Sequence, residues 1–192
     1  MRDDYKFFMP DQKVQFLSTL KDSKNGWRDY FMFSLMLVTG LRISEALGLN
    51  VGDIFKDGAA VKSFELVGKG GKTRLVHVNK AVRERVAGYL KAKRKNGEET
   101  DESSPLFMSR HHKRISVRAV QHSFNNWVDL SKLEGKYSPH SLRHTAGTEM
   151  LKKHGNIRVV QSFLGHSNVR TTQRYTGVTK EDVMEAAELL TV

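Results

Sequence analysis

The chain of 192 residues contains no cysteine, which excludes disulfide bonds and metal sites built from thiolates. It has no apolar run near the roughly 18 residues that a membrane span needs, and its start, M-R-D-D-Y-K, carries no apolar signal segment. These absences lead us to expect a cytoplasmic protein. Hydrophobic residues, at 39% of the sequence, suffice for an ordinary packed core.

Acidic residues are too few to balance the basic ones. The 21 Asp and Glu residues face 32 Lys and Arg residues, so the formal net charge is +11 at pH 7. Such an excess indicates an acidic partner, and nucleic acid is the usual one. The alternative is a solvated basic surface that has no partner.

The apolar pattern predicts a mainly helical domain with one small antiparallel sheet, an α+β fold over residues 1–192. Trp27 to Val38 is apolar on nearly every side, which is typical of a buried helix. Two strands, 61–67 and 73–78, flank the hairpin connection Gly68-Lys69-Gly70-Gly71. Further helices are predicted over 10–20, from Arg42, over 80–96 and 116–131, from Pro139, and over 157–164 and 180–190.

The stretch from Ser138 to Tyr175 carries the chemistry. It reads S-P-H-S-L-R-H, then L-G-H, then R-Y-T, and so supplies His140, Arg143, His166 and Tyr175. An arginine can hold a phosphate through two parallel donors, and a histidine can move protons near neutral pH. A tyrosine becomes a good nucleophile only where cations and donors stabilise the developing charge. The combination suits attack on a phosphate by the phenol.

Four motifs carry a family resemblance: T-G-L-R-I-S-E-A-L-G-L, V-G-K-G-G-K-T-R-L-V, H-S-L-R-H-T-A and F-L-G-H-S-N-V-R-T-T-Q-R-Y-T. In this order, from about Phe7 to about Leu190, the chain resembles the catalytic domain of the tyrosine recombinases, or phage-type integrases. The resemblance implies that fold. It also implies a site-specific recombinase that cleaves and rejoins DNA through a 3′-phosphotyrosine link, in a prokaryote, phage or mobile element, near the nucleoid.

The resemblance also assigns the roles. Two arginines would grip the scissile phosphate, a hairpin lysine would protonate the leaving 5′ oxygen, one histidine would transfer a proton and another would bind the phosphate. The two arginines would be Arg42 and Arg143, and the lysine Lys69. His140 would transfer the proton, His166 would bind the phosphate, and Tyr175 would be the nucleophile. Lys72 competes with Lys69, and Glu45 would orient Arg42. Neither ATP nor a metal nor another cofactor is implied.

Some of these residues have plainer interpretations. Arg42 and Glu45 could form a structural ion pair, and His166 could be a surface histidine at a helix end. His140 and His144 are four residues apart, which suits zinc. The metalloprotease pattern, however, needs a glutamate directly after the first histidine, where this chain has Ser141. We therefore expect no metal.

Basic residues outside the motifs are candidates for DNA contact. A cluster at 110–114 precedes a helix, and it could bind phosphates or be a solvated loop. Arg118 on that helix could reach base edges. The candidates are Lys72, Arg110, Lys113, Arg114, Arg118, Arg170 and Arg174.

The expected partner is double-stranded DNA, bound by a homotetramer whose subunits are monomeric or weakly associated when free. The C-terminal segment, 180–192, could pack on a neighbouring copy or fold back on its own domain. Typical integrases carry a DNA-binding domain before the catalytic one, and the early T-G-L-R motif leads us to expect none here. The chain would be a fragment or a naturally short recombinase. Two alternatives are a type IB topoisomerase and a non-catalytic DNA-binding regulator.

Overall fold

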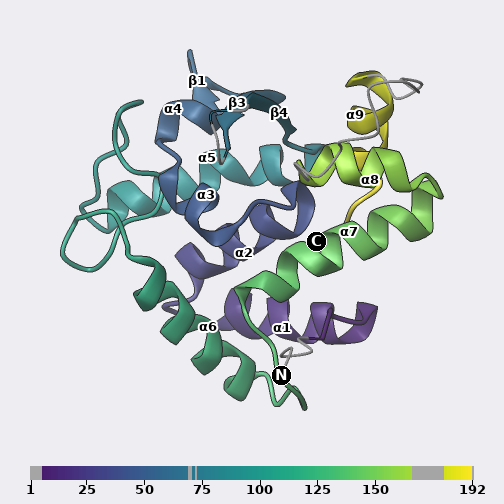
Figure 1. Cartoon of the computed structure of the whole chain (residues 1–192). Coiled ribbons are helices and arrows are strands. Elements are labelled where there is room, and N and C mark those ends of the chain that lie inside the picture. Colours follow the sequence, from purple (N-terminus) through teal and green to yellow (C-terminus); the bar gives the residue numbers. More distant parts are fainter. Residues whose placement is uncertain (1–5, 69–70, 72, 166–179, 192) are drawn as a thin grey trace.

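The computed structural model of the chain describes residues 6–68, 71, 73–165 and 180–191. Helices dominate, and two small antiparallel sheets lie at one edge of the molecule, at the top in Figure 1. The helices are α1 (Pro10–Asp22), α2 (Trp27–Thr39), α3 (Ile43–Gly48), α4 (Val51–Ile54), α5 (Lys80–Lys95), α6 (Val117–Leu130), α7 (Pro139–His154), α8 (Ile157–Leu164) and α9 (Lys180–Glu188). The strands are β1 (Phe55–Lys56), β2 (Ala59–Ala60), β3 (Ser63–Val67) and β4 (Thr73–His77).

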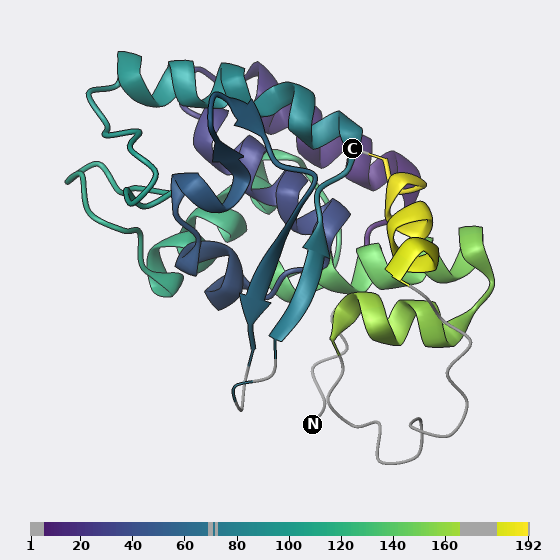
Figure 2. The same cartoon turned by 90° about the horizontal axis from the view of Figure 1, so that it is seen from above.

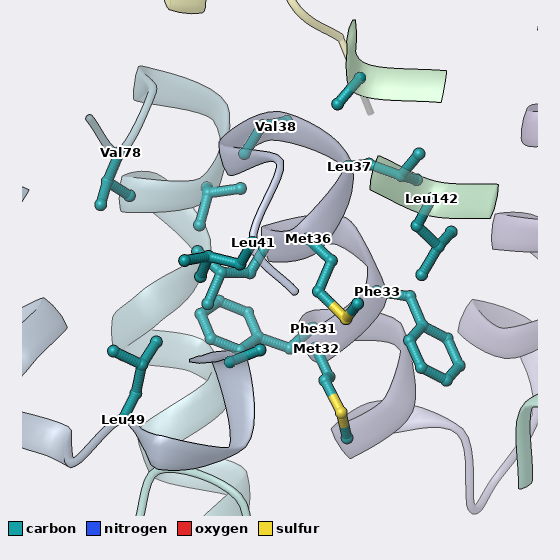
Figure 3. Close-up of a cluster of buried hydrophobic side chains, with 14 of the residues drawn as sticks. Phe31, Met32, Phe33, Met36, Leu37, Val38, Leu41, Leu49, Val78 and Leu142 are labelled. Carbon is teal, nitrogen blue, oxygen red and sulfur yellow. The ribbon is translucent and has the colours of Figure 1, made fainter. Parts of the chain in front are cut away.

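Helix α2 lies at the centre, as its apolar sequence predicts. Every residue from Phe31 to Thr39 is buried, and the helix packs against α1, α5 and α7. Figure 3 shows its side chains reaching to both sides, with Leu142 of α7 on one side and Val78 on the other. Gly40 ends the helix in the left-handed conformation, with φ of 62°. A Cβ there would lie 2.8 Å from Leu164, so the position favours glycine twice over.

A cluster of phenylalanines joins α1, α2 and α6. The ring of Phe124 lies 5.3 Å from the rings of both Phe16 and Phe33, measured between centroids, and Phe8 closes the cluster. All four side chains are buried. These contacts connect helices that are far apart in the sequence, so the core depends on them.

The predicted hairpin is confirmed with slightly shorter strands. Strands β3 and β4 pair antiparallel from Ser63↔His77 to Val67↔Thr73. In Figure 2, β4 is the strand on the side of α8 and α9, and it packs against α9. The turn signal at Asp57-Gly58 forms a second, two-residue pair, β1 with β2, that was not predicted. Both turn residues have positive φ, which suits an Asp-Gly turn.

Capping residues open helix α7 at the start of the C-terminal half. Ser138 caps α7 by accepting a hydrogen bond from the backbone N–H of His140 at 3.2 Å, and Pro139 occupies the first turn. Helix α8 has the predicted bounds and ends at Gly165, with φ of 62°. Helix α9 packs against α7, α8 and β4 of the same chain.

Two valines in the helices α1 and α6 lie at the surface. Val14 is 65% exposed, because the buried face of α1 runs through Lys13, Phe16, Leu17 and Leu20 and excludes it. Val117, the first residue of α6, is also exposed, since it precedes the turn that meets the core. Within the described residues, no helix is long and apolar enough to cross a membrane.

Replacing Phe124 by alanine should lower the free energy of unfolding by about 3–5 kcal/mol, because it leaves a cavity among three other rings. Chemical denaturation monitored by circular dichroism measures this. The control, Val14→Ala, should change stability by no more than about 0.5 kcal/mol, since its side chain is solvated. Equal losses in the two variants would contradict the assignment of the core.

Candidate active site

Three guanidinium groups gather around one carboxylate. Arg42 immediately precedes α3, Arg74 belongs to β4, Arg143 lies on α7, and the carboxylate is Glu45 in the first turn of α3. These segments are separated by up to about 100 residues in the chain, so the fold brings the charges together. With three positive charges and one negative, the cluster has a net charge of +2. A cluster of this kind attracts an anion.

Glu45 accepts four hydrogen bonds. Its Oε1 and Oε2 accept from Nη1 and the backbone N–H of Arg42, both at 2.8 Å. They also accept from Nη1 and Nη2 of Arg74 at 3.0 and 2.8 Å. Burial acts to raise the pKa of this carboxyl, but the hydrogen bonds and charges of Arg74 and Arg42 outweigh it and lower the pKa to about 2. Glu45 is therefore ionised at neutral pH. The predicted pairing of Glu45 with Arg42 is confirmed in geometry, and Arg74 is an unpredicted second partner.

Arg143 is buried, with only 3% of its surface exposed. Its Nη1 donates to the carbonyl of Gly40 and its Nη2 to that of Leu164, both at 2.5 Å. Burial, followed by the positive charge of Arg42, lowers its pKa to about 10, so it stays charged at neutral pH. Two carbonyls at helix ends thus hold a charged guanidinium in one position.

His140 lies one turn before Arg143 on α7, and the residue as a whole is exposed to solvent. Partial burial of its ring lowers its pKa below 6.5, and the positive charges of Arg143, His144 and Arg42 lower it further. The imidazole is therefore mostly neutral at pH 7 and able to accept a proton. His144 packs against the ring of Phe7, with centroids 5.7 Å apart.

Several predicted site residues lie outside the described residues: Lys69, Lys72, His166, Arg170, Arg174 and Tyr175. The described residues next to them lie close to the cluster. Gly165, which precedes His166, packs so closely on Arg74 that a Cβ would come within 2.6 Å of its Cδ. Arg74 itself lies two residues after Lys72. The structure therefore brings Arg42, Arg143, Glu45 and His140 together. Gly165 and Arg74, described residues close to His166 and Lys72 in the sequence, lie beside this cluster.

The candidates for DNA contact divide into two groups. Arg110, Lys113, Arg114 and Arg118 are all exposed as residues, but among the described residues the side chains of Arg110, Lys113 and Arg118 make no hydrogen bond. Arg114 instead donates to the carbonyls of Leu47 and Leu49 at 2.5 and 2.9 Å, and to Oδ1 of Asn50 at 2.5 Å. Its guanidinium therefore secures the end of α3, a structural role that the sequence did not indicate. Contact of Arg114 with DNA has less support than contact of the other three.

Arg74 was quoted within a motif but not recognised as part of the site. The alternation of a strand could have indicated it, because residues two apart share a face. Val76 is buried, so Arg74 lies on the same inward face, while Leu75 between them is exposed. An arginine on an inward face needs an acidic partner.

The described part of the chain contains no group of three His, Asp or Glu side chains that could hold a metal ion. The donors that converge here are cationic nitrogens, which bind anions and repel metals. Such a cluster is suited to an oxyanion.

Comparison with known proteins agrees with this geometry. Residues 6–182 match the model of the phage integrase family. The chain belongs to this family. Tyrosine recombinase XerC of Caldanaerobacter subterraneus subsp. tengcongensis is 43% identical over 162 residues, which cover 83% of this chain and 44% of that protein. The chain spans about half the length of the curated relatives it matches.

Solved structures give the same result for the fold. The crystal structure of XerA recombinase matches with a TM-score of 0.72 and 25% identity, covering 93% of this chain and 62% of that one. The XerH site-specific recombinase bound to palindromic difH substrate matches with a TM-score of 0.70, covering 95% of this chain and 52% of that one. At 22% identity, the XerH match supports the fold alone. The predicted family and fold class are therefore confirmed.

The ionisation of Glu45 gives a testable pH dependence. Since its folded pKa is about 2 and its ordinary value is 4.5, its stabilising contribution is complete above pH 4.5 and is lost as pH falls towards 2. Glu45→Gln should be less stable at pH 7 and should lose less stability than the wild type between pH 4.5 and 2. Urea denaturation across this range measures it.

The matched control is Glu84→Gln, because Glu84 is exposed and pairs only loosely with Lys80 at 3.9 Å. This variant should follow the pH profile of the wild type. A Glu45→Gln profile parallel to that of the wild type would show that Glu45 is not the acidic group held by the arginines.

Proposed function

We propose that this chain is the catalytic part of a site-specific DNA recombinase in which Tyr175 attacks a DNA phosphodiester. The observation that carries the proposal is the cluster of net charge +2 around Glu45, which includes Arg42 and Arg143 and lies beside a neutral His140. It occurs in a chain of the phage integrase family. The cluster supports phosphate binding, and the family membership supports the reaction.

The first step exchanges one phosphodiester for another. Oη of Tyr175 bonds to the phosphorus, and the bond from phosphorus to the 5′ oxygen of the next nucleotide breaks. The phenol proton passes to His140, and Lys69 gives a proton to the departing oxygen. The products are a 3′-phosphotyrosine link and a free 5′ hydroxyl. The covalent link preserves the energy of the broken bond, so the step needs no nucleotide triphosphate.

The arginines supply electrostatic stabilisation. Attack on phosphorus concentrates negative charge on the non-bridging oxygens, and donors already in position lower the energy of that state. Arg143 is held rigidly by Gly40 and Leu164, so little reorganisation is needed when the phosphate arrives. His166 would add a hydrogen bond to the same phosphate. A 5′ hydroxyl from another strand would then attack the phosphotyrosine and complete the exchange.

The proposed substrate is double-stranded DNA. The net charge of +11 supports it, and the solved structure of XerH shows that recombinase bound to its difH substrate. Exposed Arg110, Lys113 and Arg118 are suited to the phosphate backbone, as are Lys72, Arg170 and Arg174 by sequence. These contacts would fall steeply with salt.

We infer that the protein assembles as a tetramer on DNA and that α9 takes part. Ala186, Ala187 and Leu190 are buried against the same chain, and Asn79 donates to the carbonyl of Leu190 at 2.9 Å. The surface that binds α9 of its own chain can equally bind α9 of an identical neighbouring copy. Exchange of α9 would link protomers while preserving these contacts.

The nucleophile can be tested without a known target. The protein is incubated with fragmented DNA from its source, the reaction is stopped with detergent, and DNA covalently bound to protein is recovered. Wild type should yield adducts and Tyr175→Phe none, since only the hydroxyl is removed. Tyr30→Phe, which alters a tyrosine on α2, should yield adducts like the wild type.

The pattern of outcomes separates the functions. Adducts that lead to exchange between two DNA molecules support a recombinase, whereas nicking and resealing within one molecule indicate a type IB topoisomerase. DNA-dependent activity that is intact in Tyr175→Phe would indicate a non-catalytic regulator.

Deletion of the residues after Thr179 should weaken assembly on DNA, because it removes α9. Gel-shift and cross-linking measurements on the adduct-forming DNA report assembly, and circular dichroism of the free protein reports folding. A truncated chain that folds, assembles and recombines normally would contradict the role of α9. A chain that folds but stays monomeric on DNA would support it.

A further inference from the structure

Arg74 differs from Arg42 and Arg143 in that both of its terminal nitrogens bind a carboxylate, whereas those of Arg143 bind the carbonyls of Gly40 and Leu164. Nη1 and Nη2 both bind Glu45, in two parallel bonds that fix the plane of the carboxylate. Its side chain is only 13% exposed, and its Nε is buried without a hydrogen-bond partner among the described residues. A Cβ at Gly165 would lie 3.1 Å from that Nε. Arg74 is enclosed and its charge is matched by Glu45, so it serves the carboxylate rather than an incoming phosphate.

Arg42 has the opposite arrangement. Its side chain is 41% exposed and gives only Nη1 to Glu45. Within the described residues no acceptor is recorded for its Nε or Nη2, so these donors can serve a ligand. The carboxylate of Glu45 therefore binds the guanidinium of Arg42 through one terminal nitrogen.

The balance of charge explains why two arginines share this carboxylate. A single pair of Arg42 and Glu45 would be neutral, and the carboxylate would compete with a phosphate for Arg42. With Arg74 also bound, the three groups carry a net charge of +1, and the positive charge that is not enclosed belongs to Arg42. Repulsion between the two guanidiniums also favours an anion on the exposed side.

From this geometry we propose that Arg74 is a positioning residue for phosphate activation. It neutralises and orients Glu45, so that Arg42 presents its charge and free donors to the scissile phosphate. The inference rests on the proposed function for its DNA substrate. Lysine cannot replace Arg74, because one ammonium cannot make the two parallel bonds that fix the carboxylate.

The test compares two substrates that carry the DNA sequence recovered in covalent adducts. One has the native scissile phosphate. The other has a methylphosphonate there, in which a methyl group replaces one non-bridging oxygen and removes the negative charge. Single-turnover rates of adduct formation are measured for the wild type, Arg74→Lys and a matched control.

With the native phosphate, Arg74→Lys should form adducts roughly 10–100-fold more slowly, the range typical of a weakened charge-stabilising contact. Its affinity for DNA before cleavage should stay within about threefold, because many other contacts bind the backbone. With the methylphosphonate, its deficit relative to the wild type should fall to about threefold or less, since one negative charge fewer develops on the phosphorus oxygens for Arg42 to stabilise. Equal deficits on both substrates would show a merely structural role and overturn the proposal.

The control is Arg28→Lys. Arg28 is also a partly buried arginine paired with one acidic residue, Asp29, at 2.7 Å and with 22% of its side chain exposed. It begins α2, at the opposite end of that helix from Gly40. This variant should cleave both substrates at wild-type rates. Thermal unfolding of both variants checks that they are folded.

Failure of the proposed function would be recognised separately, because the wild type would then form no adduct on any DNA. In that case the free protein is titrated with inorganic phosphate, and the side-chain NMR signals of Arg42 are followed. Arg74→Lys should bind phosphate at least about fivefold more weakly than the wild type, as expected for loss of a buried charge interaction. Equal affinity would overturn the role of Arg74.

Discussion

The site depends on the burial of one charged side chain, Arg143, between the ends of two helices. A guanidinium inside a protein needs acceptors, and here they are the carbonyls of Gly40 and Leu164. Helices α2 and α8 must both end at this point, and glycines in the left-handed conformation, Gly40 and Gly165, end them. The negative ends of two helix dipoles then face the same cation. The C-terminal end of the central helix α2 is therefore also part of the site.

The same arrangement gives the site an excess of positive charge. Glu45 is the carboxylate that binds Arg42 and Arg74, while the guanidinium of Arg143 binds only carbonyls in the recorded contacts. Mutual repulsion costs stability, and an oxyanion would relieve it. An affinity for anions would thus be a property of the folded protein before any substrate is bound.

Local patterns in the sequence predicted most of the architecture. The apolar run of α2, the caps of α7 and α8, and the glycine-rich hairpin each have a signal within a few residues, and the observed bounds agree closely. Family motifs placed Arg42, Glu45, His140 and Arg143 together. The contacts of Arg74 and Arg114 were not predicted, because their partners, Glu45 and Leu47, are 29 and 67 residues away in the sequence. Only the packed fold brings such partners into contact.

The way α9 is held affects how copies of the chain compete. The helix buries small side chains, Ala186 and Ala187, and adds polar contacts from Glu188 to His77 and Lys80. Because the helix is tethered to its own domain, its effective concentration at that surface is on the order of millimolar. A dissolved copy at micromolar concentration would rarely displace it, whereas a copy bound alongside on one DNA would meet it at a comparable local concentration. The attachment of α9 to its own chain would thus favour its folding back over exchange between free molecules.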